Sequence, residues 1–103
     1  MSLENSRRYD FRYGHILANA PRDSGVFALF REESWLYVGE ANSICTGLLD
    51  RLEKNRRVST PEPATSFAFE VCPPEHRTAR LVAVVFKHRP MHCDRPEFLL
   101  RER

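Results

Sequence analysis

The stretch SGVFALFREESWLYVGEA, residues 24–41, decides the fold, because it holds two short apolar runs on either side of a charged turn. The first run, residues 26–30, is apolar at every position, which is typical of a central strand that is covered on both faces. Residues 31–34 form a short polar connection, and the second run follows at 35–38. Two such runs around a tight polar turn predict an antiparallel β-hairpin.

After the hairpin, the spacing of apolar residues changes from the period of a strand to that of a helix. Asn42 or Ser43 is a suitable N-cap. The apolar positions that follow recur at helical spacing and predict an amphipathic first helix; they are Ile44, Leu48, Leu49 and Leu52.

A third strand and a second helix follow in the second half of the chain. Residues 66–71, SFAFEV, alternate in hydrophobicity and predict a strand. Pro73 and Pro74 suit the first turn of a helix that should end before Pro90. We expect its inward positions to be Ala79, Val82, Ala83 and Phe86.

The order strand, strand, helix, strand, helix predicts an α/β (α+β) fold. Its core is a small three-stranded sheet, mixed and mostly antiparallel, flanked by helices. We expect an N-terminal extension at 1–20, one domain at 21–93, and a C-terminal tail at 94–103 that carries the apolar cluster Phe98-Leu99-Leu100.

Composition limits the classes of function. The chain has 103 residues, enough for one modest core, and its net charge of +2 is too small to establish a polyanion as partner. Lys54 and Lys87 are the only lysines among 16 basic residues. The rest are arginines, which suit bidentate contact with phosphate but also follow genomic base composition.

The number of cysteines and the hydropathy of the chain indicate the cellular compartment in which we expect the protein. Three cysteines, an odd number, in a chain without a secretory leader favour a reducing, cytoplasmic setting. No apolar run approaches the roughly 20 residues that span a bilayer, so we expect no membrane association.

The hairpin carries two tripeptides, Gly25-Val26-Phe27 and Tyr37-Val38-Gly39, with Glu40 directly after the second. Together with the helix that contains Arg51-Leu52 and the terminal Lys-His-Arg-Pro at 87–90, they resemble the GIY-YIG nuclease family over residues 21–93. The resemblance implies phosphodiester hydrolysis of DNA that depends on Mg²⁺ or Mn²⁺.

The resemblance also implies where the chemical groups should stand. In the family, hairpin tyrosines lie near the attacking water and an arginine of the first helix holds the phosphate. A glutamate of the second helix binds the cation, and an asparagine often follows in the terminal loop. Tyr37 keeps its hydroxyl, and Arg51 lies one helical turn after the arginine position. The other matching positions are occupied by Phe27, Gly47, Leu81 and Cys93.

The leading hypothesis is therefore a degenerate GIY-YIG-like domain that has lost hydrolysis and acts as a nucleic-acid-binding or protein-interaction module. Its nucleic-acid-binding candidates cluster at the end of the first helix; they are Arg51, Lys54, Arg56 and Arg57. A second basic group flanks the second helix, at Arg77, Arg80, Lys87 and Arg89. Aromatic side chains that could contribute to a shallow nucleic-acid surface are Tyr9, Tyr13 and Trp35.

Two alternative hypotheses assign the protein to other functional classes. The first is a working endonuclease with relocated ligands, in which Tyr37 acts as a base or orients water, Arg51 holds the phosphate, and Glu40 or Glu75 binds Mg²⁺ or Mn²⁺. The second is a non-enzymatic assembly subunit, a homo-oligomer or a partner of another protein, that uses the cluster at 98–100.

Histidines and cysteines in the second half form a competing pattern for zinc. Cys72 and His76 precede the second helix, and His88, His92 and Cys93 follow it. About 18 Å of helix separates the two groups, so only a chain reversal would unite them. Cys45 lies in the first turn of the first helix, where a thiolate would be favoured, although a small buried residue is the more common role.

Overall fold

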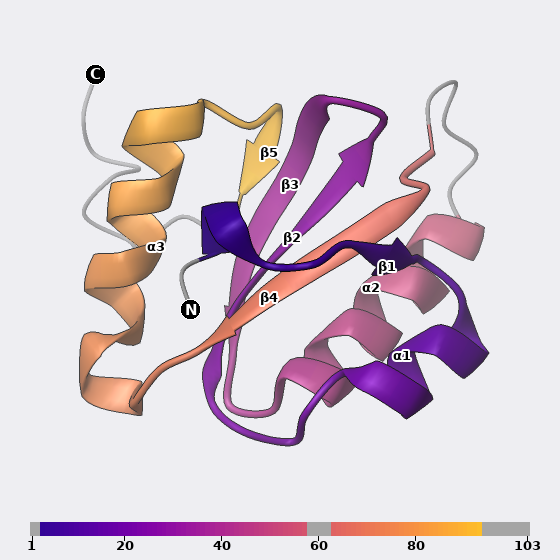
Figure 1. Ribbon diagram of the computed structural model, residues 1–103, viewed down its shortest axis with the longest axis horizontal. Coiled ribbons are helices and arrows are strands. Elements are labelled where there is room, and N and C mark those ends of the chain that lie inside the picture. Colours follow the sequence, from indigo (N-terminus) through magenta and orange to yellow (C-terminus); the bar gives the residue numbers. More distant parts are fainter. Residues whose placement is uncertain (1–2, 58–62, 94–103) are drawn as a thin grey trace.

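Among the described residues, a mixed sheet of five strands runs through the centre, in the order β1-β4-β2-β3-β5 (Figure 1). The computed structural model describes residues 3–57 and 63–93. The antiparallel strands are β1 (Tyr9–Asp10), β2 (Gly25–Arg31), β3 (Ser34–Ala41) and β4 (Ser66–Val71). The fifth strand, β5 (His92–Cys93), pairs with β3 in parallel.

The predicted hairpin and the α+β class are confirmed, with β2 in the central position expected from its apolar run. Leu29 lies opposite Tyr37, and Phe27 lies opposite Gly39. The sheet has two strands more than predicted. β1 and β5 contain two residues each, which is too short for alternation to be visible in the sequence.

Helices cover both faces of the sheet (Figure 1). One face packs against α1 (Tyr13–Asn19) and α2 (Ile44–Arg57), and the opposite face packs against α3 (Pro74–His88) and a short 3-10 turn, η1 (Leu3–Asn5). The side chains of the hairpin alternate between the two faces of the sheet, as they do in any β-strand. Phe27, Leu29 and Tyr37 join the core under α1 and α2, whereas Val26 and Val38 join the core under α3.

The two predicted long helices are present. Ser43 caps α2, because its Oγ accepts a hydrogen bond of 3.3 Å from the Thr46 N–H. Helix α3 starts at Pro74 and ends at His88, and Arg89 closes it with a left-handed φ of 50°. Its bounds therefore agree with the prediction.

The predicted inward face of α3 is wrong. The helix buries Leu81 and Val84, while Phe86 is 50% exposed, and the other three residues expected inside, Ala79, Val82 and Ala83, are exposed or half-buried. Arg77 and Arg80 lie on the same side as Leu81 and pair with carboxylates of the sheet. These ion pairs fix the rotation of the helix, and its own sequence does not reveal them.

The segment expected as an N-terminal extension packs against both faces of the sheet. Leu3 is 1% exposed in the core under α3, and Phe11 and Ile16 are buried under α1 and α2. The predicted C-terminal tail, with Phe98-Leu99-Leu100, lies outside the described residues. Within the described ranges, no helix is long and apolar enough to cross a membrane.

Candidate nucleic-acid interface

Tyr37 and Arg51 come together between α2 and the sheet. Tyr37 is 6% exposed, and its ring faces α2 from the middle of β3. Arg51 projects from the α2 side that carries Ile44 and Leu48, and its Cζ lies 4.0 Å from the centre of the Tyr37 ring. A guanidinium at this distance over an aromatic face gains a cation–π attraction of about 0.5–2 kcal/mol.

The guanidinium of Arg51 has an unusual environment. Its Nε is buried and has no hydrogen-bond partner among the described residues. A buried donor without an acceptor costs about 1–3 kcal/mol. An oxygen acceptor supplied by a ligand would remove this cost, so Arg51 combines a fixed position with unused donor capacity.

Phe27 and Gly47 fill the remaining space beside Tyr37. The Phe27 and Tyr37 rings lie 6.0 Å apart at 34°. A Cβ at Gly47 would approach the Cβ of Ala41 to 2.8 Å and Cε2 of Phe27 to 3.0 Å. The position that the resemblance gives to an arginine therefore has no room for a side chain, and Arg51 brings the guanidinium to Tyr37 from one turn later.

Glu40 lies away from Tyr37, which differs from the expectation that both border one site. Successive strand residues alternate between faces, so Tyr37 and Glu40 point to opposite sides of the sheet. On the α3 side, Oε1 of Glu40 accepts a hydrogen bond of 2.9 Å from Nε of Arg77. The structure thus brings together Tyr37 and Arg51 but not Glu40.

The positions that would bind a divalent cation do not offer a suitable donor set. Leu81, where the resemblance places a glutamate, is apolar and fully buried under α3. Glu75 lies in the first turn of α3, which covers the face opposite Tyr37, and it is exposed. In residues 3–57 and 63–93, no group of three His, Cys, Asp or Glu side chains is placed to hold a metal ion. The described side chains therefore do not fit the Mg²⁺ or Mn²⁺ of the family, nor the zinc site suggested by the histidines.

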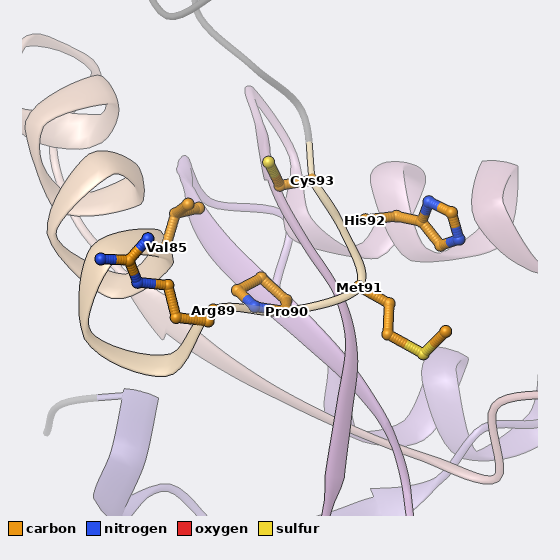
Figure 2. Close-up of a pocket in the computed structure, with 6 residues that line it drawn as sticks. All are labelled: Val85, Arg89, Pro90, Met91, His92 and Cys93. Carbon is orange, nitrogen blue, oxygen red and sulfur yellow. The ribbon is translucent and has the colours of Figure 1, made fainter.

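A pocket of about 300 Å³ lies where α3 turns into β5 (Figure 2). It includes Cys93, where the resemblance expects an asparagine. Arg89 and His92 point in opposite directions (Figure 2). The six described residues that line it, none of them a carboxylate, are Val85, Arg89, Pro90, Met91, His92 and Cys93.

Two of the other predicted basic residues, Lys54 and Arg56, are exposed on α2. Lys54 Nζ is 3.2 Å from an Asp50 carboxylate oxygen, and Arg56 is 3.9 Å from Glu53, so acids of the same helix offset part of their charge. Both cations are more than half exposed and their ion pairs are weak, which leaves them available to a polyanion. Arg57 ends the helix, and its side chain lies outside the described part of the structure.

Cys45 is a buried core residue in this structure, 3% exposed among the side chains of α1 and α2. Its backbone N–H donates to the Pro21 carbonyl, which ties the first turn of α2 to the end of α1. This placement favours a packing role for the thiol.

Sequence reasoning did not predict a charged network that lies on the α3 side of the sheet. Arg80 bonds Glu70 at 2.9 Å and Glu4 at 2.8 Å, and His88 lies 3.2 Å from Glu4 while it stacks on Trp35. Burial raises the pKa of the Glu4 carboxyl, but its own backbone N–H, His88 and Arg80 outweigh this effect and lower the pKa to about 2. The helical spacing of Arg77 and Arg80 was the only signal in the sequence. The first eight residues had no pattern that would place Glu4 beside them.

Comparisons with known proteins agree on the fold. No family model and no curated protein matches the chain. Solved structures of the GIY-YIG N-terminal endonuclease domain of UvrC from Thermotoga maritima do match. The magnesium-bound form has a TM-score of 0.61 at 19% identity and covers 77% of this chain and 92% of that one. An asparagine-to-alanine mutant gives 0.62 at 17% identity, with 77% and 91% covered. A tyrosine-to-phenylalanine mutant gives 0.59 at 23%, with 74% and 87% covered.

The sheet order, the two-sided helix cover and the hairpin define a small α+β domain. More specifically, the protein has the GIY-YIG fold, as the two hairpin tripeptides predict. At identities of 17–23%, the likeness concerns the fold, and the chemistry must be argued from this chain's own residues.

Proposed function

We propose that this domain binds nucleic acid through a phosphate contact at Arg51 and does not hydrolyse it. The observation that carries the proposal is the Arg51 guanidinium, fixed over Tyr37 with a buried Nε that has no acceptor among the described residues. A phosphate oxygen is the acceptor that an arginine fork fits best. The UvrC domains with this fold are described as endonucleases, which supports nucleic acid as the source of the phosphate.

The loss of hydrolysis is supported by the side chains at the chemical positions. Hydrolysis of a phosphodiester needs an activated water and a cation that neutralises the charge developing on the phosphoryl oxygens. Phe27 lacks a hydroxyl, Leu81 lacks a carboxylate, and Glu40 pairs with Arg77 on the other face of the sheet. Tyr37 and Arg51 alone can position a phosphodiester without cleaving it.

The proposal includes a cytoplasmic setting. Cys45, Cys72 and Cys93 are all unpaired, which is the usual state in a reducing compartment. A nucleic-acid partner is also available there.

The salt dependence of oligonucleotide binding tests the role of Arg51. We expect the log–log plot of affinity against salt to become shallower by about 0.7 in Arg51→Gln with a single-stranded ligand, since one phosphate contact is lost. Arg51→Lys should keep that slope and bind more weakly, because an ammonium cannot form the bidentate fork. The measurement is fluorescence anisotropy of a labelled oligonucleotide, with thermal melts to confirm that each variant is folded.

Arg89→Gln is the matched control, because it removes the same charge from an exposed site at the end of α3. Its slope should equal that of the unmodified protein. Equal slopes for Arg51→Gln and Arg89→Gln would contradict a phosphate contact at Arg51. No binding of any variant at low salt would instead favour a protein-interaction module.

A further inference from the structure

His92 lies beside Tyr37 at the edge of the sheet. The two residues are register partners in the parallel pair of β3 and β5. Register partners point to the same face of a sheet, so His92 shares the α2 face with Tyr37. Cys93, the next residue, is the partner of Val38, whose side chain packs under α3. Accordingly, the side chains of His92 and Cys93 leave the chain on opposite sides (Figure 2).

The Arg51 guanidinium reaches the same place from α2. Its Cζ lies 4.0 Å from the centre of the Tyr37 ring. Neighbouring strands are about 4.8 Å apart, so the ring of Tyr37 is next to both the guanidinium and the side chain of His92. An arginine from α2 and a histidine from β5 therefore border one site, and the Tyr37 ring lies beneath it.

The two histidines at the ends of the α3–β5 connection differ in what surrounds them. His88 stacks on Trp35 and lies 3.2 Å from a carboxylate oxygen of Glu4, so the α3 side of the sheet uses its ring for packing and pairing. His92 is exposed, and within the described ranges its ring has no hydrogen-bond or ion-pair partner. Its imidazole is thus available to a ligand that reaches Arg51.

The charges beside Tyr37 indicate the sign of that ligand. Lys54 follows Arg51 by three residues and lies next to it on the surface of α2. Its ion pair with Asp50 is exposed and weak, so its positive charge remains effective. Glu40, the acid nearest to Tyr37 in the sequence, faces α3 instead. An anion with several oxygens can accept hydrogen bonds from a guanidinium and an imidazole together, and phosphate is such an anion.

We propose that His92 is a second phosphate-binding residue, and that the nucleic-acid backbone lies in the seam between α2 and β5, which Arg51 and His92 border above Tyr37. This inference rests on the proposed function and adds a binding residue and the edge of the sheet that receives the ligand. Arg51 supplies the charged bidentate contact, and His92 donates one N–H to the same phosphate group.

The first test compares His92→Ala with His92→Gln in the full chain, by anisotropy of a labelled oligo-dT of about 12 nucleotides. We expect His92→Ala to weaken binding about tenfold, the usual effect of losing one hydrogen bond to a charged group. His92→Gln should keep most of the affinity, because its amide also donates N–H. Thermal melts show whether each variant is folded.

His76→Ala is the matched control for the loss of a histidine. His76 is exposed in the first turn of α3, which covers the opposite face of the sheet. This variant should bind oligo-dT as tightly as the unmodified protein. Equal weakening by His76→Ala and His92→Ala would contradict a specific contact at His92.

The double variant Arg51→Gln/His92→Ala shows whether the two residues hold one phosphate. Residues that act on the same group are not additive. The loss of affinity in this double variant should therefore be smaller than the product of the two single losses. Arg51→Gln combined with His76→Ala should give that product. Additive losses for Arg51 and His92 would overturn the shared site.

The outcomes separate this proposal from the one before it. If Arg51→Gln weakens binding but His92→Ala does not, the phosphate contact at Arg51 stands and the role of His92 is wrong. A strand with an uncharged methylphosphonate backbone should bind weakly and equally to both proteins. If His92→Ala weakens that strand as much as oligo-dT, His92 contacts the bases and the proposal fails. If the unmodified protein binds no oligonucleotide at low salt, both proposals fail.

Discussion

Gly14 and Gly47 both lie in helices, but one has open space around its Cα and the other is tightly packed. Adding a methyl group at each position shows the difference. Around Gly47, a Cβ would meet the side chains of Ala41 and Phe27 at 2.8–3.0 Å. Around Gly14, a Cβ would meet nothing within 4 Å. Helical spacing predicts the helix around Gly47, but the sequence cannot show this close approach, which depends on how α2 lies on the hairpin.

Alanine at these two positions should change stability in opposite directions. Gly14→Ala should raise the free energy of unfolding by up to about 1 kcal/mol, which is the helix propensity gained. Gly47→Ala gains the same propensity but overfills the contact with Ala41, at a cost of about 1–3 kcal/mol. We expect a lower melting temperature for Gly47→Ala and a higher one for Gly14→Ala, measured by circular dichroism. A rise for both would contradict the tight contact between α2 and the hairpin.

Tyr37 and Arg51 show what the sequence could predict about the site. Arg51 falls one helical turn after Gly47, and the resemblance together with this spacing indicated that it could replace the arginine that the family has there. The sequence also contains the information that Glu40 points to the other face. Strand alternation, read from Tyr37, would have predicted this placement.

At the scale of elements, α3 is attached to the sheet by ion pairs as much as by apolar contact. Arg77 bonds Glu40, and Arg80 bonds both Glu70 and Glu4. Two of these carboxylates come from β3 and η1, which are distant from α3 in the sequence, and Glu70 comes from β4, which directly precedes α3. The prolines at its ends therefore predicted the bounds of α3 correctly, but its periodicity did not predict its inward face.

The Glu4 carboxyl makes the stability of this attachment depend on pH. Its pKa is about 2 in the folded protein against an ordinary value of 4.5, so its contribution is complete above about pH 4.5 and is lost as the pH falls toward 2. The loss should be about 2–3 kcal/mol. Urea unfolding at a series of pH values measures it.

Glu4→Gln isolates this carboxylate from the others that titrate in acid. The variant should be less stable near neutral pH and should lose less stability on acidification. Glu33→Gln, at an exposed turn position, serves as the control and should follow the unmodified protein. An unchanged acid slope in Glu4→Gln would show that the network does not carry this dependence.

At the scale of the whole molecule, the segment before the hairpin contributes to both cores. Leu3 packs under α3, and Phe11 and Ile16 pack under α1 and α2. The sequence predicted the hairpin, both long helices and β4, because each is long enough to show its period. It missed β1 and β5, because two-residue strands are defined only by their partners.

Two substitutions in α1 test whether this segment is integral to the fold. Ile16 is fully buried and Leu17 is 46% exposed. We expect Ile16→Ala to lower the free energy of unfolding by about 2–4 kcal/mol and Leu17→Ala to change it by less than about 0.5 kcal/mol. Denaturant unfolding gives both values. A small effect of Ile16→Ala would mean that α1 behaves as an independent extension.

The central claim is that the domain holds nucleic acid without cutting it. One experiment measures both properties in the same sample. A labelled single strand is incubated with the protein and Mg²⁺ or Mn²⁺, its bound fraction is read by anisotropy, and its length is then read on a denaturing gel. We expect binding at low salt and an intact oligonucleotide. Cleavage that disappears in Tyr37→Phe, or the absence of binding, would contradict it.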